Sequence, residues 1–250
     1  MSDEVPREVE GRGTDRERSS IAKPRGRWIM SQKWKDLLFL SWPVDAARLR
    51  RFVPEALKID EIEGSAWLSI VPFWMEDAHF RGLPPLPYLS SFPEVNVRTY
   101  VSAGDHTAVW FLSLDTQSRI NVFFARRAFH LPYTYAEVEM RRGDDIEFHS
   151  VRSGGEAAVD VTYRPRGTES IPAEGSLQHF LAERYSLMCA SRSGDLYRGD
   201  IQHEPWRVQD VDWKADRIEL LAPLGLAVEG DPVAFYARST DVMLWPLVRM

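Results

Sequence analysis

The sequence predicts a mainly β (α+β) fold with two or three short helices, and three observations support this prediction. Runs of strand-forming residues are separated by short glycine-containing turns, which is typical of β-hairpins. The apolar fraction of 44% and nine tryptophans are sufficient for a large core. The chain of 250 residues carries many such runs, and a closed antiparallel barrel is the natural way to pair them all.

The chain divides into a short tail and one folded region. Residues 1–27 are charged and poor in apolar groups, so we expect a flexible N-terminal tail there. Folded sequence begins near Trp28. No internal repeat or linker interrupts residues 28–250, which we therefore expect to form a single domain.

Helices are expected at three places. Asp45 is a suitable N-cap for a short helix over 46–52. Residues 118–129 are typical of a short helix or an irregular crossover. The clearest helix follows Ser176, because apolar residues recur every three or four positions over 177–188.

Three hairpins and several single strands are expected along the rest of the chain. The ranges are 57–62 with 66–74, 94–101 with 108–114, 133–141 with 146–151, and then 157–163, 195–201, 217–221 and 233–238, the last with an extension through Trp245 left open. Residues 81–87 are too rich in proline to join a sheet. We expect a rigid loop there that acts as a lid or rim, and a polyproline ligand for another domain is the alternative.

Charge and cysteine content exclude several classes of partner. A net charge of −6 and a pI near 5.6 argue against nucleic-acid binding through phosphate contacts. The single cysteine, Cys189, excludes an internal disulfide and fits a buried, inert thiol in a reducing cytoplasm. No stretch approaches the roughly 18 apolar residues of a membrane span, and no segment resembles a signal peptide. We therefore expect a cytoplasmic protein without a membrane partner.

The run over 92–101 is the most informative stretch for function. Read with the two-residue period of a strand, it has one face with Glu94, Asn96, Arg98 and Tyr100, and another with Val95, Val97, Thr99 and Val101. If the polar face meets solvent, this is an ordinary half-buried strand. If it points into a barrel, it supplies the convergent polar groups that a small-molecule site needs.

Two further motifs are candidates for binding. Arg126 and Arg127 lie in an apolar segment, so they form either a clamp for a carboxylate or phosphate, or ion pairs with Glu94 or Asp115. His203 stands close in sequence to a carboxylate and an indole, whereas the other histidines are scattered without the spacing of a metal site. No metal or other cofactor is indicated.

Several motifs together resemble one family. They are Gln32-Lys33-Trp34-Lys35-Asp36-Leu37-Leu38-Phe39, Ser41-Trp42-Pro43-Val44, the run over 92–101, Phe111-Leu112-Ser113-Leu114-Asp115, Ala125-Arg126-Arg127, Leu131-Pro132-Tyr133, Gly175-Ser176-Leu177, Glu183-Arg184-Tyr185 and His203-Glu204-Pro205-Trp206. In this order they look like the YqjF-like bacterial proteins of unknown function, from about Trp28 to the C-terminus. That family is more distantly similar to acetoacetate decarboxylase. The resemblance implies a closed or cone-shaped β-barrel around a small-molecule cavity.

The resemblance also implies a chemical difference. In the decarboxylases a cavity lysine forms a Schiff base with a β-keto acid, and glutamate and arginine side chains line the cavity. The segment that holds paired lysines there looks like Ala125-Arg126-Arg127 here, and arginine stays protonated and forms no imine. The lysines of this chain lie elsewhere, at positions 23, 33, 35, 58 and 214. The sequence therefore argues against Schiff-base chemistry.

Two functional hypotheses follow. The first is a protein that binds or acts on a small organic acid, with no lysine chemistry. Glu94 would be its acid or base, Arg126 and Arg127 would hold the anion, and the other contacts would come from Asn96, Arg98, Tyr100, Tyr133, His203 and Trp206. As an enzyme it would be a lyase or isomerase for a small carboxylic acid. The second is a non-catalytic binding or protein-interaction module with a tryptophan-rich surface and the proline-rich loop, and a homo-oligomer is left open.

Overall fold

The computed structural model describes residues 24–87, 89–155 and 157–250. The predicted flexible tail falls on residues 1–27, and all but the last four of these lie outside the described residues. The strands are β1 (Met30–Val44), β2 (Lys58–Ile59), β3 (Glu61–Ile62), β4 (Ser65–Phe80), β5 (Phe92–Ala103), β6 (His106–Thr116), β7 (Tyr133–Arg142), β8 (Ile146–Arg152), β9 (Ala158–Ser170), β10 (Ser186–Ala190), β11 (Leu196–Gln202), β12 (Val208–Ile218), β13 (Val233–Leu244) and β14 (Val248–Arg249). The helices are α1 (Ala46–Arg50), α2 (Arg119–Ala128) and α3 (Leu177–Ala182), with a 3₁₀ turn at Ala222–Leu224.

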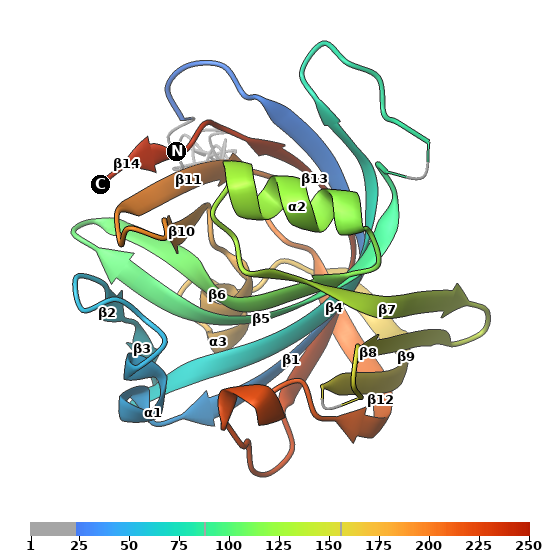
Figure 1. Cartoon of the computed structure of the whole chain (residues 1–250). Coiled ribbons are helices and arrows are strands. Elements are labelled where there is room, and N and C mark those ends of the chain that lie inside the picture. The colour runs from blue at the N-terminus through green and yellow to red at the C-terminus, as the bar shows by residue number, and fades with distance from the viewer. Residues whose placement is uncertain (1–23, 88, 156) are drawn as a thin grey trace, which may run out of the picture.

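The strands form one sheet that closes on itself twice (Figure 1). One closed ring runs β6-β7-β8-β9-β12-β13-β1-β4-β5 and returns to β6. A second ring leaves β6 through β10 and β11 and rejoins at β13. Both rings share β13, β1, β4, β5 and β6, which we call the shared wall. The predicted mainly β barrel is confirmed, and the pairings are antiparallel except for β6 with β7 and with β10.

The shared wall has interior on both of its faces. One face is packed against the apolar core, a cluster that includes Leu38, Leu40, Leu68, Ile70, Val95, Val97, Phe148, Val161 and Tyr163. The opposite face carries a second cluster with Leu37, Phe39, Val71, Phe73, Tyr100 and Trp206. Neighbouring residues of β1 and β4 alternate between the two clusters because successive side chains of a strand point to opposite faces. Consequently residues 92–101 of β5 are all buried.

Strand β1 is irregular at Asp36, and this residue links the shared wall to the opposite side of the ring. Asp36 has φ of +54°, and the register of β1 against β4 shifts between Lys35 and Leu40. The Asp36 carboxylate accepts hydrogen bonds from the Tyr236 hydroxyl and from Arg142 Nε, both at 2.6 Å. Its carbonyl accepts a third, from the Tyr163 hydroxyl at 2.7 Å. These bonds tie the shared wall to β7 and β9 across the ring.

Most predicted elements are confirmed, and two differ. The helix after Ser176 ends at Ala182 rather than reaching position 188, because the next residues form β10 and pair with β6 and β11. Of the strand expected at 217–221, only the first two residues are in a strand, as the end of β12, and residues 219–221 leave the sheet. Strands β1, β10 and the two-residue β14 are not among those expected from the sequence. The three predicted hairpins are present, and Asp45 and Ser118 cap α1 and α2.

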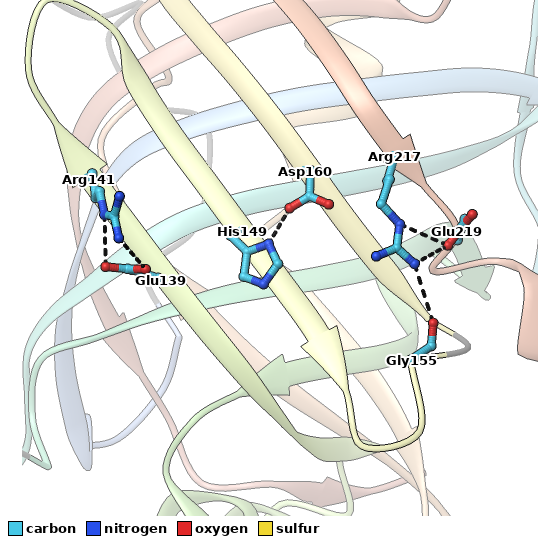
Figure 2. Close-up of polar contacts among 7 residues, drawn as sticks. All are labelled: Glu139, Arg141, His149, Gly155, Asp160, Arg217 and Glu219. Carbon is cyan, nitrogen blue, oxygen red and sulfur yellow. Dashed lines mark hydrogen bonds and ion pairs between the residues drawn. The ribbon is translucent and has the colours of Figure 1, made fainter.

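The outer face of β7, β8, β9 and β12 is polar and self-paired (Figure 2). Arg141 Nε lies 2.9 Å from a Glu139 oxygen, Arg217 Nη2 lies 2.6 Å from Glu219, and His149 contacts Asp160. Exposed pairs of this kind contribute little to stability, so this surface reads as an ordinary solvated face. The nine tryptophans all lie within the described residues and none is exposed, so the tryptophan-rich surface expected for an interaction module is wrong.

The longest helix, α2, has ten residues, and no helix within the described ranges has the length and apolar character to span a membrane.

Candidate functional site

A small cavity lies on the face of the shared wall that is opposite the apolar core. Its volume is about 80 Å³, and we call it the inner cavity. Strands β1, β4, β5 and β6 supply one side, and the segments around α3, β10 and β11 supply the other. Its polar lining residues are Gln32, Glu94, Asn96, Arg98, Tyr133, Arg184 and His203, together with the Trp206 indole.

Glu94 is a buried carboxyl in the lining of the inner cavity. Its side chain is 2% exposed and accepts a hydrogen bond from the Tyr133 hydroxyl at 2.8 Å. Burial raises the pKa of the Glu94 carboxyl to about 8; the Tyr133 bond opposes this shift and the charge of Asp115 adds to it. At neutral pH the carboxyl is therefore mostly protonated and able to donate a proton.

Arg98 is a buried cation without a carboxylate partner. Its residue is 8% exposed, and no acidic side chain in the described residues lies within ion-pair distance of it. Nη2 donates to the Leu181 carbonyl at 2.9 Å, whereas Nε has no hydrogen-bond partner among these residues. The guanidinium lies 5.2 Å from the ring centre of Phe39. A buried charge that is only partly compensated is costly, so this site favours an anion.

Two more buried polar atoms of the inner cavity lack partners. Asn96 Oδ1 and Trp206 Nε1 make no hydrogen bond within residues 24–87, 89–155 and 157–250. The Trp206 backbone N–H donates to Glu183 Oε1 at 2.7 Å, and this bond fixes the segment that carries the indole. Buried polar atoms are nearly always paired in native proteins, so three unpaired atoms on residues that line one cavity are unusual.

Arg184 and His203 line the same cavity, and each has a polar partner in the protein. Arg184 Nη1 lies 3.0 Å from Asp60 Oδ2, and burial lowers the pKa of this arginine. His203 Nδ1 lies 2.8 Å from the Glu204 carbonyl, which favours an Nδ1–H donor. Burial lowers the pKa of His203, and its ring stacks on Tyr185 at 4.4 Å. We therefore describe His203 as a neutral wall residue.

Not all of the residues predicted for binding lie in this cavity. The structure brings together Glu94, Asn96, Arg98, Tyr133, His203 and Trp206. Tyr100 lies outside the lining, fully buried, and its hydroxyl contacts Ser69 Oγ at 2.8 Å and the Leu181 carbonyl at 3.0 Å. Arg184 lies over the Tyr100 ring at 5.1 Å. The Tyr100 ring thus packs against the guanidinium groups of Arg98 and Arg184.

Arg126 and Arg127 are exposed on α2 and line no cavity described here. Helix α2 buries only Val122, so the apolar residues beside the arginines are exposed as well. Arg126 Nε donates to the Tyr133 carbonyl at 2.5 Å, and Asp115 is paired with Arg152 instead. The expected ion pairs of Arg126 or Arg127 with Glu94 or Asp115 are therefore not formed.

Sequence reasoning does not single out Gln32 and Trp34, which also line the inner cavity. The Trp34 indole N–H donates to Gln32 Oε1 at 2.9 Å, so the two side chains form one polar unit on β1. The signal that could have found them is the alternation of Met30, Gln32 and Trp34 with Ser31, Lys33 and Lys35.

A larger chamber lies beside the inner cavity, and we call it the outer chamber. Its volume is about 420 Å³. The proline-rich loop contributes Leu83, Pro84 and Leu86 to it, and α2 contributes Ile120 and Phe124. The predicted loop at 81–87 therefore does border a cavity as a rim.

No lysine that the structure describes lines the inner cavity or the outer chamber. Lys33 and Lys35 pair with Asp241 and Glu76 at the surface, and Lys58 and Lys214 are exposed. Lys23 lies outside the described residues. Within those residues, no three His, Cys, Asp or Glu side chains are grouped so that they could hold a metal ion.

The architecture is that of the acetoacetate decarboxylase-like proteins. It is similar to the enduracididine biosynthesis enzyme MppR complexed with pyruvate, with a TM-score of 0.65, 11% identity and 92% of each chain covered. The acetoacetate decarboxylase-like enzyme from Sphingomonas wittichii RW1 has a TM-score of 0.63 and 11% identity, over 90% of this chain and 94% of that one. Acetoacetate decarboxylase from Legionella pneumophila gives a TM-score of 0.61 at 11% identity, over 97% and 98% of the chains. These likenesses define the fold.

Within this fold the chain belongs to the DUF2071 family, described as an uncharacterized conserved protein, which it matches over residues 31–241. It is also 39% identical over 234 residues to the uncharacterized protein YqjF of Bacillus subtilis (strain 168). That alignment covers 92% of this chain and 96% of the Bacillus protein. The family predicted from the motifs is confirmed.

Proposed function

We propose that the inner cavity binds a small organic acid and that Arg98 holds its carboxylate. The observation that carries this proposal is the buried Arg98 guanidinium, which has no carboxylate partner within the described residues and a free Nε. A ligand carboxylate would supply the missing negative charge and accept the missing hydrogen bond. Because arginine pairs with carboxylates through two parallel N–H groups, this arrangement selects a planar anion.

The other unpaired atoms suit the rest of such a ligand. The Trp206 indole N–H can donate to a carboxylate or keto oxygen, and Asn96 Oδ1 can accept from a hydroxyl or amide. The volume of about 80 Å³ limits this end of the ligand to a few heavy atoms. MppR was solved with pyruvate, a small carboxylate, and this supports the same ligand class on a shared fold.

If the ligand is turned over, Glu94 is the residue suited to proton transfer. Its pKa of about 8 lies near neutral pH, which suits a group that both gives and takes a proton. No described lysine lines the cavity, so the reaction would be that of a lyase or isomerase that needs no imine. Glu94 would protonate or deprotonate the carbon or oxygen next to the bound carboxylate.

Isothermal titration with acetate, lactate, pyruvate and acetoacetate tests this proposal. At least one of these acids should bind the wild type, and Arg98→Gln should weaken it about 100-fold, as expected for the loss of a buried charge-assisted bond. Arg127→Gln is the matched control, because it removes an exposed arginine outside the cavity.

Two results would overturn the proposal. One is that none of the four acids binds. The other is that the control variant weakens binding as much as Arg98→Gln, which would return the anion site to α2, as the sequence predicts for Arg126 and Arg127.

The alternative is a non-catalytic binding or protein-interaction module. The observation in its favour is a group of exposed apolar side chains, among them Leu83, Leu86 and Phe124, around the outer chamber. A module that uses only this surface would bind none of the acids, so the same titration separates the two functions.

A further inference from the structure

We propose that the outer chamber holds the apolar chain of the same ligand, so that the natural ligand is an amphiphilic carboxylic acid. This inference rests on the proposed function of the inner cavity. It adds a substrate class: the carboxylate end binds in the inner cavity, and a hydrocarbon or aromatic body extends into the outer chamber.

The two spaces share part of their lining. Gln32, Leu131, Tyr133, Leu187 and Leu244 border both the inner cavity and the outer chamber. A ligand that contacts Arg98 and passes these five residues therefore enters the outer chamber. Tyr133 stands at this boundary with its hydroxyl on Glu94, so the boundary is also the edge of the polar site.

Polar groups differ between the two spaces. The inner cavity has three buried polar atoms without partners, on Asn96, Arg98 and Trp206. In the outer chamber the polar side chains are occupied with the protein itself. Ser90 Oγ accepts from the Leu86 N–H at 2.7 Å, and Asn121 Nδ2 donates to the Leu89 carbonyl at 3.1 Å. The inner cavity therefore requires polar ligand atoms, and the outer chamber offers contact to apolar ones.

The outer chamber also collects exposed apolar surface. Of the nine most exposed large apolar side chains in the described residues, five line it: Phe80, Leu83, Leu86, Ile120 and Phe124. Such a concentration on one feature marks a binding site rather than scattered surface residues. The bond from Asn121 to the Leu89 carbonyl joins α2 to the loop between β4 and β5, so the walls are held together without a ligand (Figure 1).

The volumes of the two spaces also favour a ligand that occupies both. At about 80 Å³ the inner cavity is far smaller than a typical ligand pocket of about 300–1,000 Å³, and the outer chamber of about 420 Å³ falls within that range. A ligand that filled only the inner cavity would leave the larger, more apolar space to water.

The test is a chain-length series measured by isothermal titration with acetate, butanoate, hexanoate and octanoate, each below the concentration at which it self-associates. Each methylene buried in the outer chamber should tighten the Kd about threefold to fourfold until the chamber is full. As a headgroup control, 1-hexanol should bind at least tenfold more weakly than hexanoate, because it cannot pair with Arg98.

Two neighbouring phenylalanines provide matched variants. Phe124 is 61% exposed and lines the outer chamber, whereas Phe123 is 62% exposed and does not line it. Their rings touch edge to face at 5.7 Å, so either substitution removes that contact. Phe124→Ala should weaken octanoate binding about fivefold and leave acetate unchanged. Phe123→Ala should leave both within twofold of the wild type.

The outcomes separate this inference from the proposed function. If short acids bind through Arg98 but the Kd does not fall with chain length, the inner-cavity proposal stands and the amphiphilic ligand is overturned. If no acid of any length binds, both are overturned. Tightening with chain length that is the same for hexanol and hexanoate, or for Phe124→Ala and wild type, overturns the inference too. So does a dimer in light scattering that Phe124→Ala abolishes and Phe123→Ala retains, since a second copy would then fill the chamber.

Discussion

The two faces of the shared wall are built from the same strands, yet they differ in what they bury. On the face toward the apolar core, Val95 and Val97 of β5 meet Ile70 of β4, and this side is filled by apolar side chains. On the other face, the intervening residues Glu94 and Asn96 border a cavity. A step of one residue along β5 therefore moves from a packed core to a polar, partly unpaired site.

This difference separates stability from function within a single strand. The core face gains from each buried methylene, whereas the cavity face carries a buried acid, a buried cation and polar atoms without partners, all of which oppose folding. Buried polar groups that lower stability are therefore candidates for a functional role. Replacing a buried polar group of the cavity face by an apolar one should therefore raise stability, whereas truncating a buried apolar side chain should lower it.

The largest effect is expected on the core face. Ile70→Ala should lower the free energy of unfolding by about 2–5 kcal/mol, because Ile70 is fully buried in the apolar core. Urea unfolding measures this loss, and the ligand Kd of the folded protein should not change. Val71→Ala, one residue along and on the cavity face, should lose less than half as much and should alter the Kd. Equal losses for the two variants would contradict the division between the faces.

A pH dependence should follow from Glu94. Its pKa rises from an ordinary 4.5 to about 8 through burial, so between these values the folded state keeps a proton that the unfolded chain has released. Wild-type stability should therefore fall as pH rises from about 4.5 to about 8, by up to ~1.4 kcal/mol per pH unit from this group. Below about pH 4.5, Glu94 is protonated in both the folded and the unfolded state, so it adds no pH dependence. Above about pH 8 it is ionised in both states, and stability falls no further on its account.

Glu94→Gln should remove this slope, so its stability relative to wild type should increase with pH across the same window. Urea unfolding at a series of pH values checks it, with Glu137→Gln, an exposed glutamate, as the control. Parallel stability curves for wild type and Glu94→Gln would show that Glu94 is ionised in the folded protein.

Arg98→Met should make the protein more stable by about 1–4 kcal/mol while it loses the carboxylate site. Replacing a buried, incompletely compensated charge by an apolar side chain of similar size is often neutral or stabilising. Thermal unfolding without ligand measures the gain. A lower Tm than wild type would show that the Leu181 contact of Arg98 outweighs its burial cost.

The smallest effect should come from Tyr133→Phe. The Tyr133 hydroxyl opposes the upward pKa shift of Glu94, so its removal should raise that pKa further above about 8. Infrared spectroscopy of the protonated carboxyl stretch, compared with Glu94→Gln to assign the band, follows the titration. A downward shift would mean that the hydroxyl stabilises the protonated form.

Sequence alone predicts the hairpins and the polar face of β5, because both depend on turn residues and a two-residue period. It does not predict β1, where four successive apolar residues, Leu37 to Leu40, conceal the alternation. The structural reason is that both faces of β1 are interior, so both need apolar side chains. The positive φ of Asp36 and the shift in register interrupt the pattern further.

The sequence pattern also does not predict that Arg126 and Arg127 are exposed. Apolar neighbours suggest burial, yet Phe123 and Phe124 are exposed because α2 lies outside the sheet and packs through Val122. Whether an apolar helix is covered depends on distant segments. The two-residue period places Arg98 on the polar face of β5. Its lack of a carboxylate partner depends on how the strands close into two rings, which the period does not show.

The double closure of the sheet also bears on how the protein moves. Strands β1, β4 and β5 are hydrogen-bonded to neighbours on both sides, and each is covered on both faces. Their amide hydrogens should exchange with solvent only when the whole molecule opens. The floor of the inner cavity should therefore be among the last parts of the molecule to open.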